Sequence, residues 1–170
     1  VDWKEDGNSI RTFYGDDGRT RSRPQNMEFF FKQAITWSLT SVSQLGFAAR
    51  HRPAGCIFDI NGMSAFPEEN DHLFLLGLLN SVVAFESLKI INPTFSFQAG
   101  DIAKVPVIRP QHVSEVSSRV SKCIELSQED WDSYEQSWGF AHHRMLKQGQ
   151  RMNLKKLHES YEAVQSEFDE

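Results

Sequence analysis

The chain has 170 residues, of which 39% are hydrophobic and 12% aromatic, a composition typical of a globular domain with a sizeable core. Its formal net charge of -5 counts against a simple DNA-coating protein, because such proteins are usually basic. No apolar run approaches the roughly 18 residues that a membrane span needs, so we expect a soluble protein without a membrane partner.

The negative charge is concentrated in the C-terminal third. Residues 1–110 carry 11 Lys and Arg against 12 Asp and Glu, whereas residues 111–170 carry 7 against 11. We predict a domain over 1–110 and a helical spacer or interaction segment over 111–170. The chain begins with Val1 and shows no signal pattern, so we expect an excised piece of a larger protein. Cys56 and Cys123 are far apart in sequence and lie in segments with a buried pattern, which predicts reduced core thiols in a cytoplasmic protein, with a disulfide as the alternative.

The first sixty residues predict short strands joined by turns. Residues 1–14 alternate weakly, as an edge strand does, and Gly15–Gly18 predict a turn. The Pro53–Gly55 segment predicts a hairpin between the strands expected at 46–52 and 55–60, and the predicted strands form an antiparallel sheet. We expect Trp37 in the core rather than stacked on a base. The predicted strands after the turn are 28–32, 35–41, 46–52 and 55–60.

The stretch from Leu73 to Pro110 predicts a helix laid on a sheet. Its apolar residues keep to one face of a helix that Asp71 is available to cap, and Asn92-Pro93 ends the helix. The pattern then changes to period two over Phe95 to Ile108, which predicts strands. Further helices are expected from Val113, from Ser127 to Trp138, and over 153–170. The residues of the first apolar face are Leu73, Leu76, Leu79, Val83 and Ile90, and those of the last helix are Leu154, Leu157, Tyr161, Val164 and Phe168.

A basic loop from Arg19 to Asn26 is the candidate binding element. Three arginines within five residues suit phosphates or guanine edges, and an amide side chain can pair with adenine. The alternative is that this loop is basic only because it is exposed to solvent. Arg50 and Arg52, which end a predicted strand, have the same alternative. The candidate DNA-contacting residues are Arg19, Arg21, Arg23, Gln25, Asn26, Arg50 and Arg52.

Several short motifs follow one another over most of residues 19–140. They are Arg23-Pro24-Gln25-Asn26, Ile35-Thr36-Trp37-Ser38, Leu79-Asn80-Ser81, Asn92-Pro93-Thr94, Gly100-Asp101-Ile102, Val105-Pro106-Val107, Glu129-Asp130-Trp131-Asp132-Ser133 and Ser137-Trp138. In this order they resemble a target-recognition region in the large adenine-specific DNA methyltransferases of BREX-type phage-defence and type II restriction-modification systems. A looser likeness extends to the specificity subunits of type I restriction enzymes.

The resemblance implies an α+β fold with a mixed, mostly antiparallel sheet and a packed helix, followed by the helical spacer. It implies sequence-specific recognition of double-stranded DNA for an adenine-N6 methyltransferase, whose catalytic domain and S-adenosylmethionine site lie outside this bacterial fragment. The rival interpretation, which the net charge favours, is a protein-interaction module that docks on the catalytic domain or on another partner.

No residue of the fragment is predicted to be catalytic. Asn92-Pro93-Thr94-Phe95 is similar to the Asn-Pro-Pro-Phe loop of amino-methyltransferases, which holds the exocyclic amine of a flipped base. Threonine replaces the second proline, however, and no glycine-rich strand, turn and helix for S-adenosylmethionine precedes it. The histidines His142, His143 and His158 lack further ligands at metal-site spacing, so we expect no metal and no cofactor in the fragment.

Overall fold

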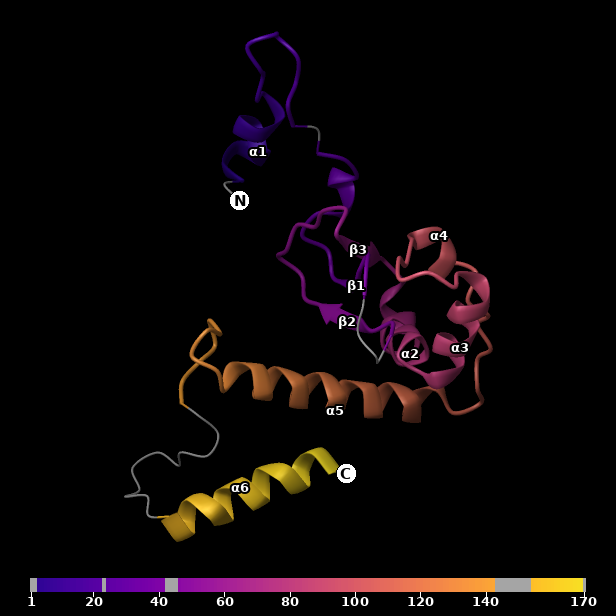
Figure 1. The fold of residues 1–170 in the computed structure, drawn as a ribbon, viewed down its shortest axis with the longest axis vertical. Coiled ribbons are helices and arrows are strands. Elements are labelled where there is room, and N and C mark those ends of the chain that lie inside the picture. The colour runs from indigo at the N-terminus through magenta and orange to yellow at the C-terminus, as the bar shows by residue number, and fades with distance from the viewer. Residues whose placement is uncertain (1–2, 23, 42–45, 143–153, 170) are drawn as a thin grey trace. The chain divides into compact units, whose positions relative to one another are not determined.

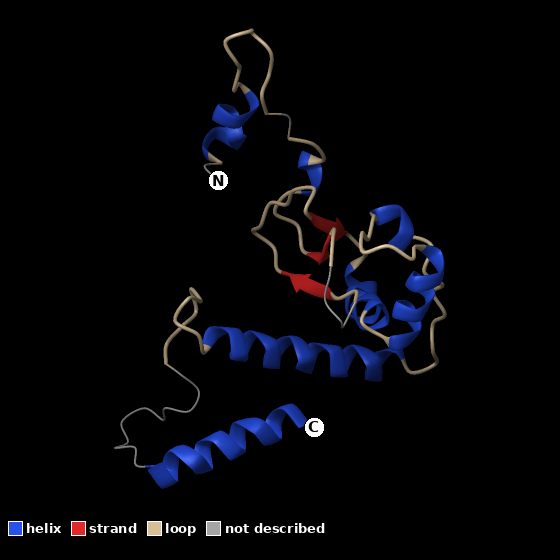
Figure 2. Cartoon of the chain, viewed as in Figure 1, coloured by secondary structure: helices blue, strands red, loops and turns tan. Residues whose placement is uncertain are grey.

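The computed structural model describes residues 3–22, 24–41, 46–142 and 154–169 (Figure 1). The chain divides into two compact units, Val1–Ile108 and Arg109–Glu170, which are treated separately below. The first unit combines helices with a small sheet, and the second contains helices and turns (Figure 2). The α+β class expected from the sequence is confirmed.

The sheet of the first unit has three antiparallel strands in the order β2-β1-β3. Its strands are β1 (Ala34–Ser38), β2 (Ala49–Arg52) and β3 (Gly62–Ala65). Trp37 is buried at 4% exposure, and its indole N–H donates a 2.9 Å hydrogen bond to the Phe97 carbonyl. The prediction that Trp37 belongs to the core is therefore confirmed.

The predicted N-terminal strand is wrong, because residues Lys4–Arg11 form the helix α1. A kink interrupts α1 where Glu5, Asp6 and Gly7 have positive φ. A Cβ atom on Gly7 would lie 2.9 Å from the Trp3 ring, so glycine permits this ring to fold back over the kink.

Two other predicted strands instead supply an aromatic cluster. Residues 28–32 belong to the 3₁₀ helix η1 (Met27–Phe29) and its following turn, and residues 55–60 are loop. Their apolar side chains pack on one another: the Phe30 ring lies 5.3 Å from Phe58, and Phe29 lies 4.7 Å from Phe66. Ring packing takes the place of a regular strand ladder, and the backbones meet only through two 2.9 Å hydrogen bonds among the described contacts, from the Phe31 N–H to the Cys56 carbonyl and from the Gly55 N–H to the Phe31 carbonyl. The hairpin predicted at Pro53–Gly55 is wrong.

The predicted single leucine-rich helix is wrong, since it consists of α2 (Glu69–Leu79) and α3 (Val82–Ile91), bent by 75°. The bend takes the later part of the predicted face out of the core: Val83 and Ile90 are 66% and 85% exposed. Glu68, rather than Asp71, occupies the N-cap of α2, while the predicted end of the helix at Asn92 is confirmed. Among the described helices, none is long and apolar enough by itself to cross a membrane, although the bent pair taken together is.

The segment after α3 agrees with the predicted strands at Ser96, which forms an antiparallel bridge with Thr40, and departs from them after Phe97. A short helix, α4 (Ala99–Ile102), follows Phe97, and residues 105–108 form no strand. Pro106 cannot donate to a strand ladder, which works against regular pairing there. Phe97 and Val105 are buried and close this end of the first unit, whereas Phe95 is 70% exposed.

The second unit contains α5 (Val113–Asp132) and α6 (Leu154–Asp169). The separate helix predicted to begin at Ser127 is wrong, because Ser127 continues α5 and residues 133–142 form turns. Both Cys56 in the first unit and Cys123 in the second are free and exposed, which corrects their predicted burial. Tyr161 of α6 is half-exposed. The other four predicted stripe residues of this helix have side chains outside the described part of the structure.

Candidate nucleic-acid interface

Residues 13–21 form a short hairpin-like loop, here called the arginine hairpin. The Arg21 N–H donates to the Phe13 carbonyl and the Gly15 N–H donates to the Arg19 carbonyl, both at 2.8 Å. Tyr14 and Thr20 pair between them in an antiparallel bridge. The predicted turn at Gly15–Gly18 is confirmed, because the Gly18 N–H donates to the Gly15 carbonyl at 2.9 Å.

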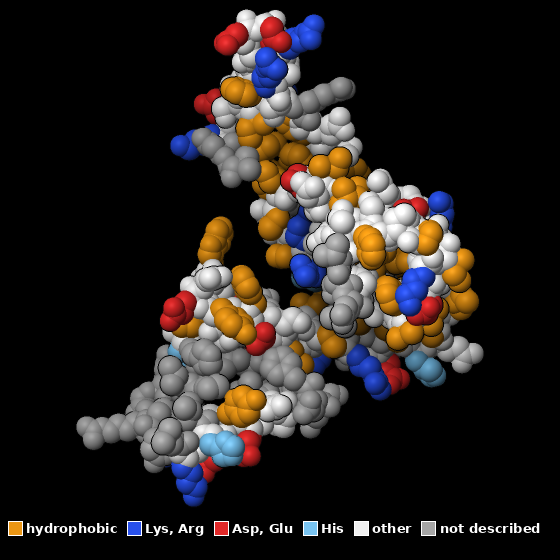
Figure 3. All heavy atoms as spheres, viewed as in Figure 1, with side chains coloured by type: hydrophobic (Ala, Val, Ile, Leu, Met, Phe, Trp, Pro, Cys, Tyr) orange, Lys and Arg blue, Asp and Glu red, His pale blue; other side chains and the backbone are white. Residues whose placement is uncertain are grey.

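The arginine hairpin presents charge and aromatic surface together. Arg19 and Arg21 are both exposed, and Phe13 and Tyr14 are each 58% exposed beside them in the chain. Arg21 pairs with Asp17 at 3.4 Å, and both side chains are about half exposed. An exposed ion pair of this kind contributes about 0–1 kcal/mol, so a phosphate can displace the carboxylate. Figure 3 shows acidic and basic side chains together at the end of this loop.

The remaining predicted contact residues lie in different settings. Gln25 and Asn26 are exposed, and Asn26 adopts a left-handed φ of 56° immediately before η1. Arg50 is exposed on β2. Arg23 lies outside the described residues. The structure thus brings Arg19 and Arg21 together in the arginine hairpin.

Arg52 differs from the other arginines because its side chain is buried, at 9% exposure. Its guanidinium lies over the rings of Phe58 and Phe66, at 5.0 and 5.5 Å from their centroids. One nitrogen donates to the Ser64 hydroxyl at 3.0 Å, while Nε and Nη2 are buried without a hydrogen-bond partner. Burial accordingly lowers the pKa of this guanidinium. Arg52 is therefore a buried residue whose guanidinium packs on aromatic rings of the core.

The Leu79-Asn80-Ser81 motif connects the two helices to the sheet. Asn80 Nδ2 donates to the carbonyls of Ala49 and Leu76, and Asn80 Oδ1 accepts from the Ala49 N–H at 3.0 Å. Ser81 then begins α3, since its hydroxyl accepts from the Ala84 N–H as an N-cap. The motif therefore has a structural role in this fold.

In the Asn92-Pro93-Thr94 motif, the side-chain amide of Asn92 forms hydrogen bonds within the protein. Asn92 Nδ2 donates to the Ser96 carbonyl at 2.8 Å and to Asp101 Oδ2 at 2.7 Å. Asn92 Oδ1 accepts from both the N–H and the hydroxyl of Thr94. A catalytic asparagine needs its side-chain carbonyl to accept from the target amine, and here that oxygen already accepts two hydrogen bonds. These contacts agree with the predicted helix stop.

His51 and His72 form a contact that the sequence did not indicate. Nδ1 of His51 lies 2.9 Å from Nε2 of His72, and this hydrogen bond joins β2 to α2. Burial lowers the pKa of both imidazoles, and the nearby His51 lowers that of His72 further. Among the described residues, no group of three or more His, Cys, Asp or Glu side chains could hold a metal ion.

The exposed aromatic pair of the arginine hairpin was missed as a functional feature, because Phe13 and Tyr14 were assigned to an edge strand. The available signal was their position directly before a Gly-Asp-Asp-Gly turn with arginines behind it. Two aromatic residues facing solvent beside arginines are a feature of single-strand and loop recognition as well as of base stacking.

Two known proteins are similar to most of this chain, although no protein-family model matches it. Over 150 residues, 86% of the chain, it is 37% identical to a Lacticaseibacillus casei (strain Zhang) protein named adenine-specific methyltransferase PglX. Over 149 residues, again 86% of the chain, it is 32% identical to adenine-specific methyltransferase BrxX of Escherichia coli O9:H4 (strain HS). The chain spans 12% and 11% of these two relatives. It is therefore homologous to a small segment of adenine-specific methyltransferases.

Proposed function

We propose that this chain supplies sequence-specific DNA recognition to an adenine-N6 DNA methyltransferase of a phage-defence or restriction-modification system. The observation that carries the proposal is the arginine hairpin, in which two exposed arginines and two exposed aromatic side chains share one short loop. The names of the two relatives support an association with adenine methylation.

The proposed contacts divide between phosphates and base edges. Arg19, Arg21 and Arg23 neutralise phosphates or donate two hydrogen bonds to guanine, while Gln25 and Asn26 suit the N6 and N7 positions of adenine. Phe13 and Tyr14 add apolar contact with sugars or thymine methyl groups. Arg50 extends the set from β2. Arg52 is left out, because its buried guanidinium does not reach a groove without leaving the aromatic cluster.

The proposal assigns the methyl transfer to another part of a longer, cytoplasmic protein. That part would hold S-adenosylmethionine and the flipped adenine, and the present chain would position the duplex against it. Its partners are accordingly double-stranded DNA and the catalytic domain of the same methyltransferase.

A fluorescence-anisotropy titration of the 170-residue chain with duplex DNA tests the proposal. Arg19→Ala combined with Arg21→Ala should weaken binding at least about tenfold, since each arginine contact contributes roughly 1 kcal/mol or more. Arg119→Ala is the matched control, because Arg119 is an exposed arginine of α5 that pairs with Glu115. Equal losses in the two variants, or no binding at low salt, would contradict the proposal.

A protein-interaction module is the second candidate, and the net charge of -4 over residues 111–170 favours it. In that case the chain would bind the catalytic domain with an affinity that the Arg19 and Arg21 substitutions leave unchanged. The DNA titration with the same variants therefore distinguishes the two functions, because an interaction module has no DNA binding for the Arg19 and Arg21 substitutions to weaken.

A further inference from the structure

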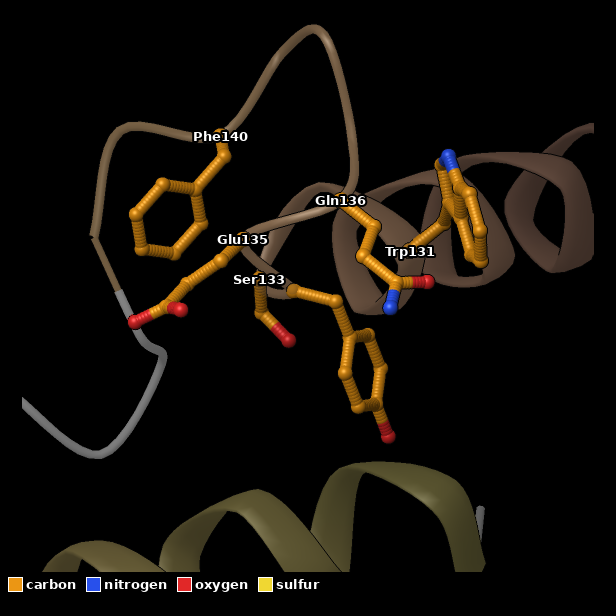
Figure 4. A pocket seen from close by; sticks show the side chains of 6 residues that line it. Trp131, Ser133, Glu135, Gln136 and Phe140 are labelled. Carbon is orange, nitrogen blue, oxygen red and sulfur yellow. The ribbon is translucent and has the colours of Figure 1, made fainter.

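The turns that follow α5 enclose an aromatic pocket that the proposed DNA contacts do not use. The pocket has a volume of about 420 Å³. Figure 4 shows Gln136 on the side of Trp131 and Glu135 on the side of Phe140. This segment contains the Trp131-Asp132-Ser133 motif of the sequence. The lining residues are Trp131, Ser133, Tyr134, Glu135, Gln136 and Phe140.

Internal contacts hold the pocket in shape. The Ser133 hydroxyl donates to the Asp130 carbonyl at 2.7 Å, and the Ser137 hydroxyl donates to the Asp132 carboxylate. Successive turns continue from there, with the Ser137 N–H donating to the Tyr134 carbonyl at 2.9 Å. A Cβ atom on Gly139 would lie 2.7 Å from the Asp132 carboxyl group, so a larger residue there would push this side chain aside. These contacts therefore fix the backbone that carries the lining side chains.

The pocket combines open aromatic faces with negative charge. Trp131 and Tyr134 are 56% and 53% exposed, and their rings lie 6.5 Å apart. Residues 129–140 contain four acidic residues and neither lysine nor arginine. Aromatic faces attract cations through the ring quadrupole, and a nearby carboxylate adds to that attraction. The same charge repels the phosphates of a nucleic acid.

We propose that this pocket binds an arginine side chain from a basic segment of a partner protein. The guanidinium stacks on Trp131 or Tyr134, because a planar, weakly hydrated cation makes contact over the whole ring face. The Glu135 carboxylate adds negative charge on the opposite side of the pocket, which favours a cation there. Trp138, which is fully exposed just beyond the pocket, extends the surface available to the same partner segment.

Nuclear magnetic resonance with the 170-residue chain tests this site. The probe is a short glycine-arginine peptide, and the readout is the backbone amide signals of residues 131–136. We expect Trp131→Ala to weaken binding about fivefold or more, and Glu135→Gln to weaken it about threefold. Glu125→Gln is the matched control and should leave the affinity unchanged. Glu125 is an exposed acidic residue of α5 that does not line the pocket. Unchanged far-ultraviolet circular dichroism would show that the variants fold.

Three results would overturn the assignment. The first is the absence of peptide-dependent shifts at residues 131–136. The second is equal binding of a peptide in which glutamate replaces arginine. The third is a stronger response of the same amide signals to duplex DNA than to the arginine peptide. Because these signals lie outside the arginine hairpin, a failure here leaves the DNA-binding proposal to be judged by its own titration.

Discussion

The side chain of Asn80 forms a reciprocal pair of 3.0 Å hydrogen bonds with the backbone N–H and carbonyl of Ala49. Ala49 belongs to β2, which is an edge strand of the sheet. The amide of Asn80 thus occupies backbone groups that an additional strand would otherwise bind, and it also caps α2 through the Leu76 carbonyl. One side chain fixes the bend between α2 and α3 against the sheet.

Replacement of Asn80 with alanine should lower the free energy of unfolding by about 1–3 kcal/mol, because it leaves backbone groups without partners. Chemical unfolding followed by circular dichroism measures the change. Asn70→Ala, at an exposed position in the first turn of α2, is the control and should have little effect. Equal stability of the two variants would show that the Asn80 contacts contribute nothing.

The contributions of the Asn92 and Asp101 side chains to the free energy of unfolding should be coupled, because the two side chains are hydrogen-bonded to each other. A double-mutant cycle with Asn92→Ala and Asp101→Ala should give a coupling energy of about 0.5–3 kcal/mol, as is usual for directly bonded side chains. The cycle requires unfolding curves of the two single variants and the double variant. Strictly additive effects would contradict a direct role for this hydrogen bond in holding α4 against the end of α3.

Stability should fall at mildly acidic pH because of His51 and His72. The folded pKa of each imidazole lies below its ordinary value of about 6.5, so the unfolded chain binds more protons in this range. The stabilisation is therefore present above about pH 6.5 and is lost as the pH falls toward the lowered pKa values. Unfolding free energies at pH 7 and pH 5 measure this difference.

The variant His72→Gln should reduce that pH dependence, since glutamine keeps a hydrogen-bonding group near His51 and does not titrate. His158→Gln, which removes an exposed histidine of α6, should leave it intact. A slope that persists in His72→Gln and disappears in His158→Gln would place the titration elsewhere.

Replacement of Arg52 with methionine should preserve stability within about 1 kcal/mol or increase it, because an apolar side chain removes two buried N–H groups without partners. The same variant should bind DNA as the original chain does. Arg50→Met, at the exposed neighbouring position, should instead weaken DNA binding and leave stability unchanged. The reverse pattern would restore Arg52 to the set of DNA contacts.

The sequence predicted features that depend on local chemistry. Trp37 in the core, the turn at Gly15–Gly18 and the end of the helix at Asn92 all follow from side-chain type or from proline geometry. The antiparallel sheet was expected from the series of short predicted strands, and the α+β class was implied by the resemblance.

Features that depend on tertiary partners were not predictable. The strand predicted at 28–32 failed because Phe29 and Phe30 pack against Phe66 and Phe58, which lie in distant parts of the sequence. The helix predicted through residue 90 failed because Asn80 leaves the helix to bind Ala49. Within the candidate site, the sequence predicted the basic loop that carries Arg19 and Arg21. It did not predict that Arg52 is buried, because this burial depends on the rings of Phe58 and Phe66, which lie outside any local pattern.

The salt dependence of DNA binding is the most direct test of recognition by the arginine hairpin. The logarithm of the association constant should fall linearly with the logarithm of salt concentration, with a slope of about -0.9 for each phosphate contact. If Arg19 and Arg21 both contact phosphates, the variant with alanine at both positions should have a slope shallower by about two. A slope that is the same in the variant and in the original chain would contradict the account.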